Sequence, residues 1–192
     1  VWSVYDTWGP TIYYENAIGF ARSTNGGTSF TAATRIHNNI KGIRPSPYTP
    51  TTNPTGKNMR VNSFPSMAVD ISGGIYNGYI YIVWANVGVP GTNTGSNVSI
   101  YCMRSTDGGT TWGTPVRVNQ GYTTDGLASY FPWITCDPVT GKLFCIFYDD
   151  RNLGTSSTAC EVWVAYSENG GVTWSDFRVG DVSFTPAPIA GL

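Results

Sequence analysis

The densest group of charged side chains is Asp149-Asp150-Arg151-Asn152, which follows the strongly apolar stretch 143–148. Arg151 could bind a ligand carboxylate through two parallel hydrogen bonds, and the adjacent Asp149 and Asp150 could supply oxygen ligands to calcium. The alternative is an Asp–Arg pair that only fixes the loop after a strand. We favour this alternative because Asp6 recurs at the same place after another apolar stretch, and a recurring residue indicates scaffold.

Aromatic side chains in long connecting segments form a second group of candidates. The segments 38–62, 86–97 and 119–130 are rich in Gly, Pro, Thr and Asn, and we predict that they are loops. Tyr122 and Tyr130 lie in the last of them. Because tyrosine has a flat apolar face, it stacks well on sugar rings. We therefore group Tyr122 and Tyr130 with Asp149, Asp150 and Arg151 as candidate ligand-binding residues; a solvated connector without a ligand is an equal alternative.

Few residues suit acid–base catalysis, and the catalytic residues stay unknown. The glutamates are Glu15, Glu161 and Glu168. Glu15 follows Tyr14 in a predicted loop, Glu161 begins a predicted strand, and Glu168 lies in a predicted turn. The single histidine, His37, ends a strand-like pattern and is expected at the surface, which gives no support to a Ser-His-Asp triad.

The cysteines indicate neither a metal site nor a favoured disulfide. Cys102, Cys136, Cys145 and Cys160 show no Cys-x-x-Cys spacing. A turn over 137–141 would place Cys136 opposite Leu143 and not opposite Cys145. We expect buried thiols, no metal and no cofactor, with calcium as the alternative noted above.

Composition excludes several classes of protein. The 192 residues include 11 Lys and Arg against 12 Asp and Glu, and 12% are charged. This balance argues against a nucleic-acid binder, and no apolar run is long enough to span a membrane. Abundant Gly and aromatic residues favour an all-β protein. The chain begins with Val1 and no charged-then-apolar leader, so we expect a mature chain or a piece of a longer one.

Three segments repeat the pattern Ser-x-(Asp/Asn)-Gly-Gly-x-x-(Trp/Phe), and we call them the box turns. They span 23–30, 105–112 and 167–174. Glycine permits the positive φ of a tight turn, and Asp or Asn can accept hydrogen bonds from its own turn. We assign a structural role to their shared residues: Ser23, Asn25, Gly27, Phe30, Ser105, Asp107, Gly109, Trp112, Ser167, Asn169, Gly171 and Trp174.

The flanking strands repeat with the box turns. Residues 64–70 match 131–137, residues 81–85 match 145–149, and residues 1–6 look like another copy of the second strand. In the best repeat the predicted strands are 131–137, 142–149, 160–167 and 174–179. Four antiparallel strands per repeat indicate the blades of a β-propeller.

The box turns resemble the Asp-box, or BNR repeat, of sialidase-like β-propellers of the secreted bacterial type. The resemblance implies a six-bladed propeller, of which about three blades are present. We predict a partial blade of strands 2–4 with a long loop at 1–63, a second blade at 64–130, a third at 131–182, and the start of another blade or a tail at 183–192. The missing blades could belong to a longer chain or to a second copy.

The same resemblance implies a glycan-related function. A sialidase needs an arginine cluster, a tyrosine nucleophile with a glutamate, and an acid–base aspartate, but the Phe/Tyr-Arg-Ile-Pro motif is absent and glutamate is scarce. We therefore expect a non-catalytic extracellular or cell-surface module that binds glycans or serves adhesion or assembly. The alternative is a portion of an exo-sialidase. The expected partners are carbohydrate and further blades or a second copy, without nucleic acid or a membrane span.

Overall fold

The computed structural model describes residues 1–7, 13–44, 53–57, 59, 61–121 and 126–187. Within them the chain forms strands and no α-helix, which confirms the all-β class. The strands are β1 (Trp2–Thr7), β2 (Tyr13–Phe20), β3 (Thr34–Asn38), β4 (Ser66–Val69), β5 (Ile80–Val89), β6 (Thr94–Ser105), β7 (Val116–Arg117), β8 (Ser129–Cys136), β9 (Leu143–Asp149), β10 (Glu161–Ser167) and β11 (Ser175–Arg178).

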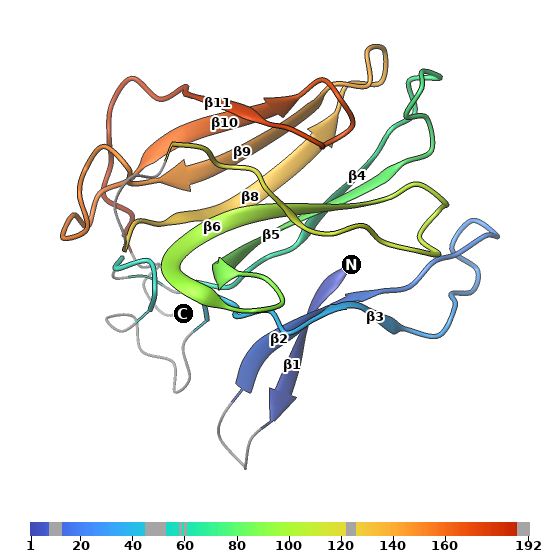
Figure 1. The fold of residues 1–192 in the computed structure, drawn as a ribbon, viewed down its shortest axis with the longest axis horizontal. Helices are drawn as coiled ribbons and strands as arrows, with labels where there is room; N and C mark the ends of the chain where they lie inside the picture. The colour runs from blue at the N-terminus through green and yellow to red at the C-terminus, as the bar shows by residue number, and fades with distance from the viewer. Residues whose placement is uncertain (8–12, 45–52, 58, 60, 122–125, 188–192) are drawn as a thin grey trace.

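The strands form three antiparallel sheets (Figure 1). We call them the first sheet (β1-β2-β3), the middle sheet (β4-β5-β6-β7) and the third sheet (β8-β9-β10-β11). The four strands predicted within 131–179 are confirmed to within two residues at each end. The described residues form an open array of sheets and not a closed ring.

The middle sheet is covered by hydrophobic side chains on both faces. Ile18 and Phe20 of the first sheet pack with Ile82 and Trp84 in one core. The opposite face contributes to a second, larger core with the third sheet, which includes Val83, Ile100, Cys145, Phe147 and Trp174. As a result β5 is buried at every residue except Val89.

Strand pairing confirms one prediction about register and corrects another. Cys136 pairs with Leu143, as the turn predicts, and all four cysteines are free thiols. However, Ile80 pairs with Ser105 while Leu143 pairs with Ser167, so Ile80 and Leu143 are equivalent. Our match of 81–85 with 145–149 was therefore wrong by one residue. Such a slip exchanges the two faces of a strand.

The recurrence of Asp6 at the place of Asp149 was also wrong. Asp149 pairs with Glu161, six residues before the serine of its box turn, and the residue six before Ser23 is Ala17. Ala17 pairs with Val4, whereas Asp6 lies beyond a register shift and pairs with Tyr14. A structural role for Asp149 must therefore rest on its own contacts.

The three box turns share one set of hydrogen bonds. In each, the serine hydroxyl donates to the Asp or Asn oxygen, at 2.8–3.0 Å, and accepts from the backbone N–H of the second glycine at 2.8–3.0 Å. The same Asp or Asn oxygen accepts a backbone N–H four residues later, at 2.8–3.0 Å. These side chains close the turns that join the last two strands of each sheet, which are β2 and β3, β6 and β7, and β10 and β11.

The predicted loop at 86–97 was wrong in most of its length. Residues 86–89 continue β5 and residues 94–97 begin β6, so only a short turn separates the two strands. A register shift between Val87 and Val89 accommodates Gly88, which has a φ of 70°. The glycines that suggested a loop instead lie in an irregular hairpin.

Candidate functional site

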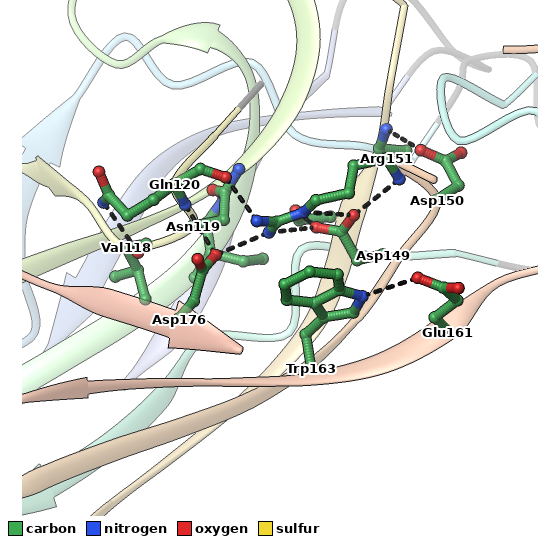
Figure 2. A network of polar contacts seen from close by, with 12 residues as sticks. Val118, Asn119, Gln120, Asp149, Asp150, Arg151, Glu161, Trp163 and Asp176 are labelled. Atoms are coloured by element: carbon green, nitrogen blue, oxygen red, sulfur yellow. Dashed lines mark hydrogen bonds and ion pairs between the residues drawn. The ribbon is translucent and has the colours of Figure 1, made fainter. Parts of the chain in front are cut away.

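Arg151 is held by protein groups on several sides (Figure 2). Its Nε and Nη2 donate to the two carboxylate oxygens of Asp149 at 2.9 and 2.8 Å, and Nη2 also reaches Asp176 at 2.7 Å. Nη1 donates to the Gln120 carbonyl at 2.6 Å, and the guanidinium lies 3.9 Å from the Trp163 ring centre. The fork that could have bound a ligand carboxylate is occupied by the chain itself.

Asp150 points away from Arg151's carboxylate partners and forms a separate buried pair. Its Oδ2 lies 2.8 Å from Nζ of Lys57, and both side chains are buried. Its Oδ1 accepts the Ala128 N–H at 2.7 Å, and Lys57 also donates to the Ser157 carbonyl. Burial raises the pKa of Asp150, although the Ala128 N–H and Lys57 oppose the shift.

The remaining charged candidates also contact protein groups. Glu161, predicted at a strand start, is buried; it accepts from Trp163 Nε1 at 3.0 Å and pairs with Arg178 at 3.1 Å. Glu168 is exposed in its box turn and pairs with Lys142.

The tyrosine and histidine candidates differ in their exposure to solvent. Tyr130 is fully buried in the larger core against Phe131 and Tyr148, so its face is closed to a ligand. Tyr122 lies outside the described residues. The expectation that His37 is a surface residue holds only in part, because it is half-buried in β3, 5.9 Å from the Trp84 ring, and burial lowers its pKa.

A cavity of about 550 Å³ lies where the first strands of the three sheets approach one another. Residues from all three sheets or their adjoining segments line it: Val1, Trp2, Ser3, Glu15, Asn62, Phe64, Pro65, Phe131, Pro132 and Trp133. Trp133 is 70% exposed, and Phe64 and Trp2 are also exposed. Aromatic walls with a few polar groups are typical of small-molecule sites.

Two of the lining aromatics adopt a conformation that is rare for bulky residues. Phe64 and Phe131 have φ values of 42° and 55°, and each precedes a proline. Their rings meet edge to face with centres 5.3 Å apart. Backbone strain of this kind costs about 1–3 kcal/mol per residue and tends to cluster at ligand sites. Both Phe-Pro pairs therefore place a ring at the cavity by the same local means.

Polar atoms at the cavity include two buried oxygens without a hydrogen-bond partner among the described residues, Ser3 Oγ and Asn62 Oδ1. Asn62 itself is only 9% exposed. Such buried atoms usually find a partner, so a bound hydroxyl or water would satisfy them. Ser3 and Asn62 therefore bring polar side chains to the wall of the cavity.

Glu15, the carboxylate among the described lining residues, is engaged by the backbone. It lies within β2, which corrects its predicted loop position. Its oxygens accept from Ser63 N at 3.0 and 3.2 Å, Ser63 Oγ at 2.8 Å and Arg44 N at 3.4 Å. These bonds fix the segments that lead from β3 towards β4.

Sequence reasoning missed Trp133, Phe64, Phe131 and Asn62 as site residues. The repeated Phe-Pro pairs were the available signal, but we used them only to align the blades. The described residues contain no group of three or more His, Cys, Asp and Glu side chains placed to hold a metal ion. Nor does this part of the chain contain a helix with the length and apolar character needed to cross a membrane.

Comparisons with known proteins give a fold likeness. No family model matches the chain, and no curated protein sequence matches it. A Hadza microbial sialidase, Hz136, has a TM-score of 0.52 and 15% identity over 82% of this chain and 30% of that one. The α-L-arabinofuranosidase Arb93A of Fusarium graminearum, solved with an iminosugar inhibitor, has a TM-score of 0.53 and 16% identity over 91% of this chain and 45% of that one.

The chain therefore spans less than half the length of these two structures. At such low identity the likeness concerns the fold alone, and it is consistent with a propeller-like arrangement of the sheets.

Proposed function

We propose that the chain is a non-catalytic carbohydrate-binding module whose ligand occupies the cavity beside Trp133. The observation that carries the proposal is the combination of an exposed aromatic platform with the unpartnered oxygens of Ser3 and Asn62. Sugar rings offer apolar faces for stacking and hydroxyls for such oxygens. The likeness to glycoside hydrolase folds agrees with a glycan ligand.

The charge around the cavity favours a neutral sugar. Among the described residues that line the cavity none is a Lys or Arg, and Glu15 contributes a carboxylate. A sialic acid would bring a second carboxylate to this site, where the described lining residues include no cation to pair it. We accordingly expect neutral pyranosides to bind better than N-acetylneuraminic acid. We further propose that the module lies outside the cell or on its surface.

The alternative is a portion of an exo-sialidase whose remaining catalytic groups lie elsewhere. The short match to the sialidase structure, 30% of its length, keeps this alternative open. Against it, Glu15 is the only carboxylate among the described residues around the cavity and is held by Ser63 and Arg44. A fluorogenic sialoside separates the two, because steady release of its fluorophore by the chain would contradict a non-catalytic module.

Binding is tested by titration calorimetry with methyl glycosides of neutral pyranoses and with N-acetylneuraminic acid. We expect Trp133→Ala to weaken binding of the best neutral glycoside at least tenfold, about 1.4 kcal/mol. The matched control is Ile75→Ala, since Ile75 is similarly exposed, at 84%, but lies away from the cavity. Equal affinity of wild type and Trp133→Ala, or binding of N-acetylneuraminic acid alone, would refute the proposal.

A further inference from the structure

The first sheet leaves its box aromatic uncovered. In the middle sheet Trp112 packs edge to face on Phe20 of the first sheet, with ring centres 5.2 Å apart. In the third sheet Trp174 is buried in the core shared with the middle sheet. Each of these aromatics thus contacts the sheet that precedes it. The equivalent Phe30 has no preceding sheet among the described residues and is 66% exposed.

The third sheet leaves the complementary face uncovered. Ile146, Val164 and Phe177 pair across three strands, so they form one row on one face. The equivalent row of the middle sheet is Val83, Cys102 and Val116, which packs in the core with the third sheet. In the third sheet this row is open: Ile146 is 44% exposed and Phe177 is 48% exposed.

A polar contact crosses each internal interface at the same place. Arg22 Nη1 donates to the Gly108 carbonyl at 2.6 Å, and Arg104 Nη1 donates to the Gly170 carbonyl at 2.5 Å. In both cases the arginine before one box turn contacts the first glycine of the next. Position 166 would supply the next donor and holds a tyrosine, while Gly26 is the corresponding glycine of the first box turn.

We propose that these two end faces bind each other in a second copy of the chain. The Ile146–Val164–Phe177 row of one copy covers Phe30 of the other, and the Tyr166 hydroxyl donates to the Gly26 carbonyl across the interface. Because both ends of both copies are used, two copies close a ring of six sheets, within the usual four to eight of propellers.

We argue for a second copy as the occupant because each uncovered face repeats one half of an interface already present inside the chain. Further sheets of a longer chain would cover the same faces, and a single-chain native mass for these 192 residues would favour them. An unrelated partner would have to reproduce both the apolar row and the box-turn contact. A head-to-tail interface of this kind either closes into a ring or continues as a filament, so the assembly size is informative.

The test is the native mass of the 192-residue chain by light scattering and native mass spectrometry. We expect twice the chain mass of 20.8 kDa. Phe30→Glu places a charge on the first end face, and since Phe30 is exposed the variant should fold and have the single-chain mass. Val139→Glu makes the same change at an exposed turn residue off both faces, and should keep the doubled mass.

Three outcomes would overturn the proposal: wild-type protein at the single-chain mass, a continuous series of larger assemblies, or a doubled mass that survives Phe30→Glu. A second variant tests the polar contact. Tyr166→Arg restores the residue found at the two internal interfaces, and we expect its dimer dissociation constant to fall about tenfold, since a charged donor forms the stronger hydrogen bond. An unchanged constant would overturn the assignment of Tyr166 to the interface.

Discussion

Replacing Arg151 with methionine should strongly destabilise the fold. The side chain is 9% exposed and donates hydrogen bonds to Asp149, Asp176 and the Gln120 carbonyl. Its removal leaves the buried carboxylates of Asp149 and Asp176 without this cation. Breaking a buried ion pair in this way costs about 3–5 kcal/mol, a large share of the roughly 5–15 kcal/mol that stabilises a typical domain. For a chain of this size the melting temperature should fall by about 6–20 °C.

Urea unfolding followed by tryptophan fluorescence measures this change directly. Asp149→Asn in the Arg151→Met background removes one of the two orphaned charges, so it should recover part of the loss and give a coupling energy of about 0.5–3 kcal/mol. Arg151→Lys keeps the charge but loses the planar fork, and should lie between wild type and Arg151→Met.

The reasoning would be refuted if Arg151→Met cost less than 1 kcal/mol. A ligand-binding arginine would give the opposite pattern, with stability kept and sugar affinity lost. The same protein samples can be titrated with the best neutral glycoside to distinguish the two roles.

Two further predictions concern the box turns. The pKa of Asp107 is lowered from its ordinary 3.8 to about 2 by hydrogen bonds, chiefly from Thr111, so its ionised form contributes stability above pH 4 that is lost as the pH falls towards 2. Asp107→Asn should remove this part of the acid dependence in urea titrations while leaving the turn formed at pH 7. A stability difference between wild type and variant that stays the same from pH 4 to pH 2 would contradict this prediction. Gly109 and Gly27 have φ values of 89° and 87°, but an added Cβ would lie 2.6 Å from Phe20 at Gly109 and would meet nothing within 4 Å at Gly27. Gly109→Ala should therefore lower the melting temperature more than Gly27→Ala. Equal losses would show that packing between the sheets contributes nothing at Gly109.

The turns could be predicted from the sequence because their chemistry is local. Ser105, Asp107 and Gly109 lie within five residues and make the bonds that close their own turn. The same holds for the strands of the third sheet, which are bounded by turn residues. Cys136 and Leu143 were placed opposite each other for the same local reason.

Register in the middle sheet could not be predicted in this way. In a strand with one solvent-exposed face, polar and apolar residues alternate, and this alternation shows which residues face the core. β5 is buried on both faces and gives no such signal. The repeat was consequently aligned one residue off between Tyr81 and Cys145.

The cavity and the Arg151 network depend on contacts between distant parts of the chain. Asp176 lies 25 residues from Arg151 in sequence, and nothing local relates the two. A positive φ at Phe64 or Phe131 is likewise invisible in the sequence, because neither residue is a glycine. The repeated Phe-Pro pairs marked the right places without showing what the rings do there.

The burial of β5 on both faces has a consequence for cooperativity. The strands of the middle sheet contribute side chains to both cores. A change that disrupts the packing of Ile82 or Trp84 on one face must therefore also disrupt the packing of Val83 on the other face. In a simple repeat array each unit contributes its own stability and the ends can fray separately. Here the middle sheet couples its neighbours, and the described chain should lose its structure in a single transition whose slowest-exchanging amides lie in β5 and β6.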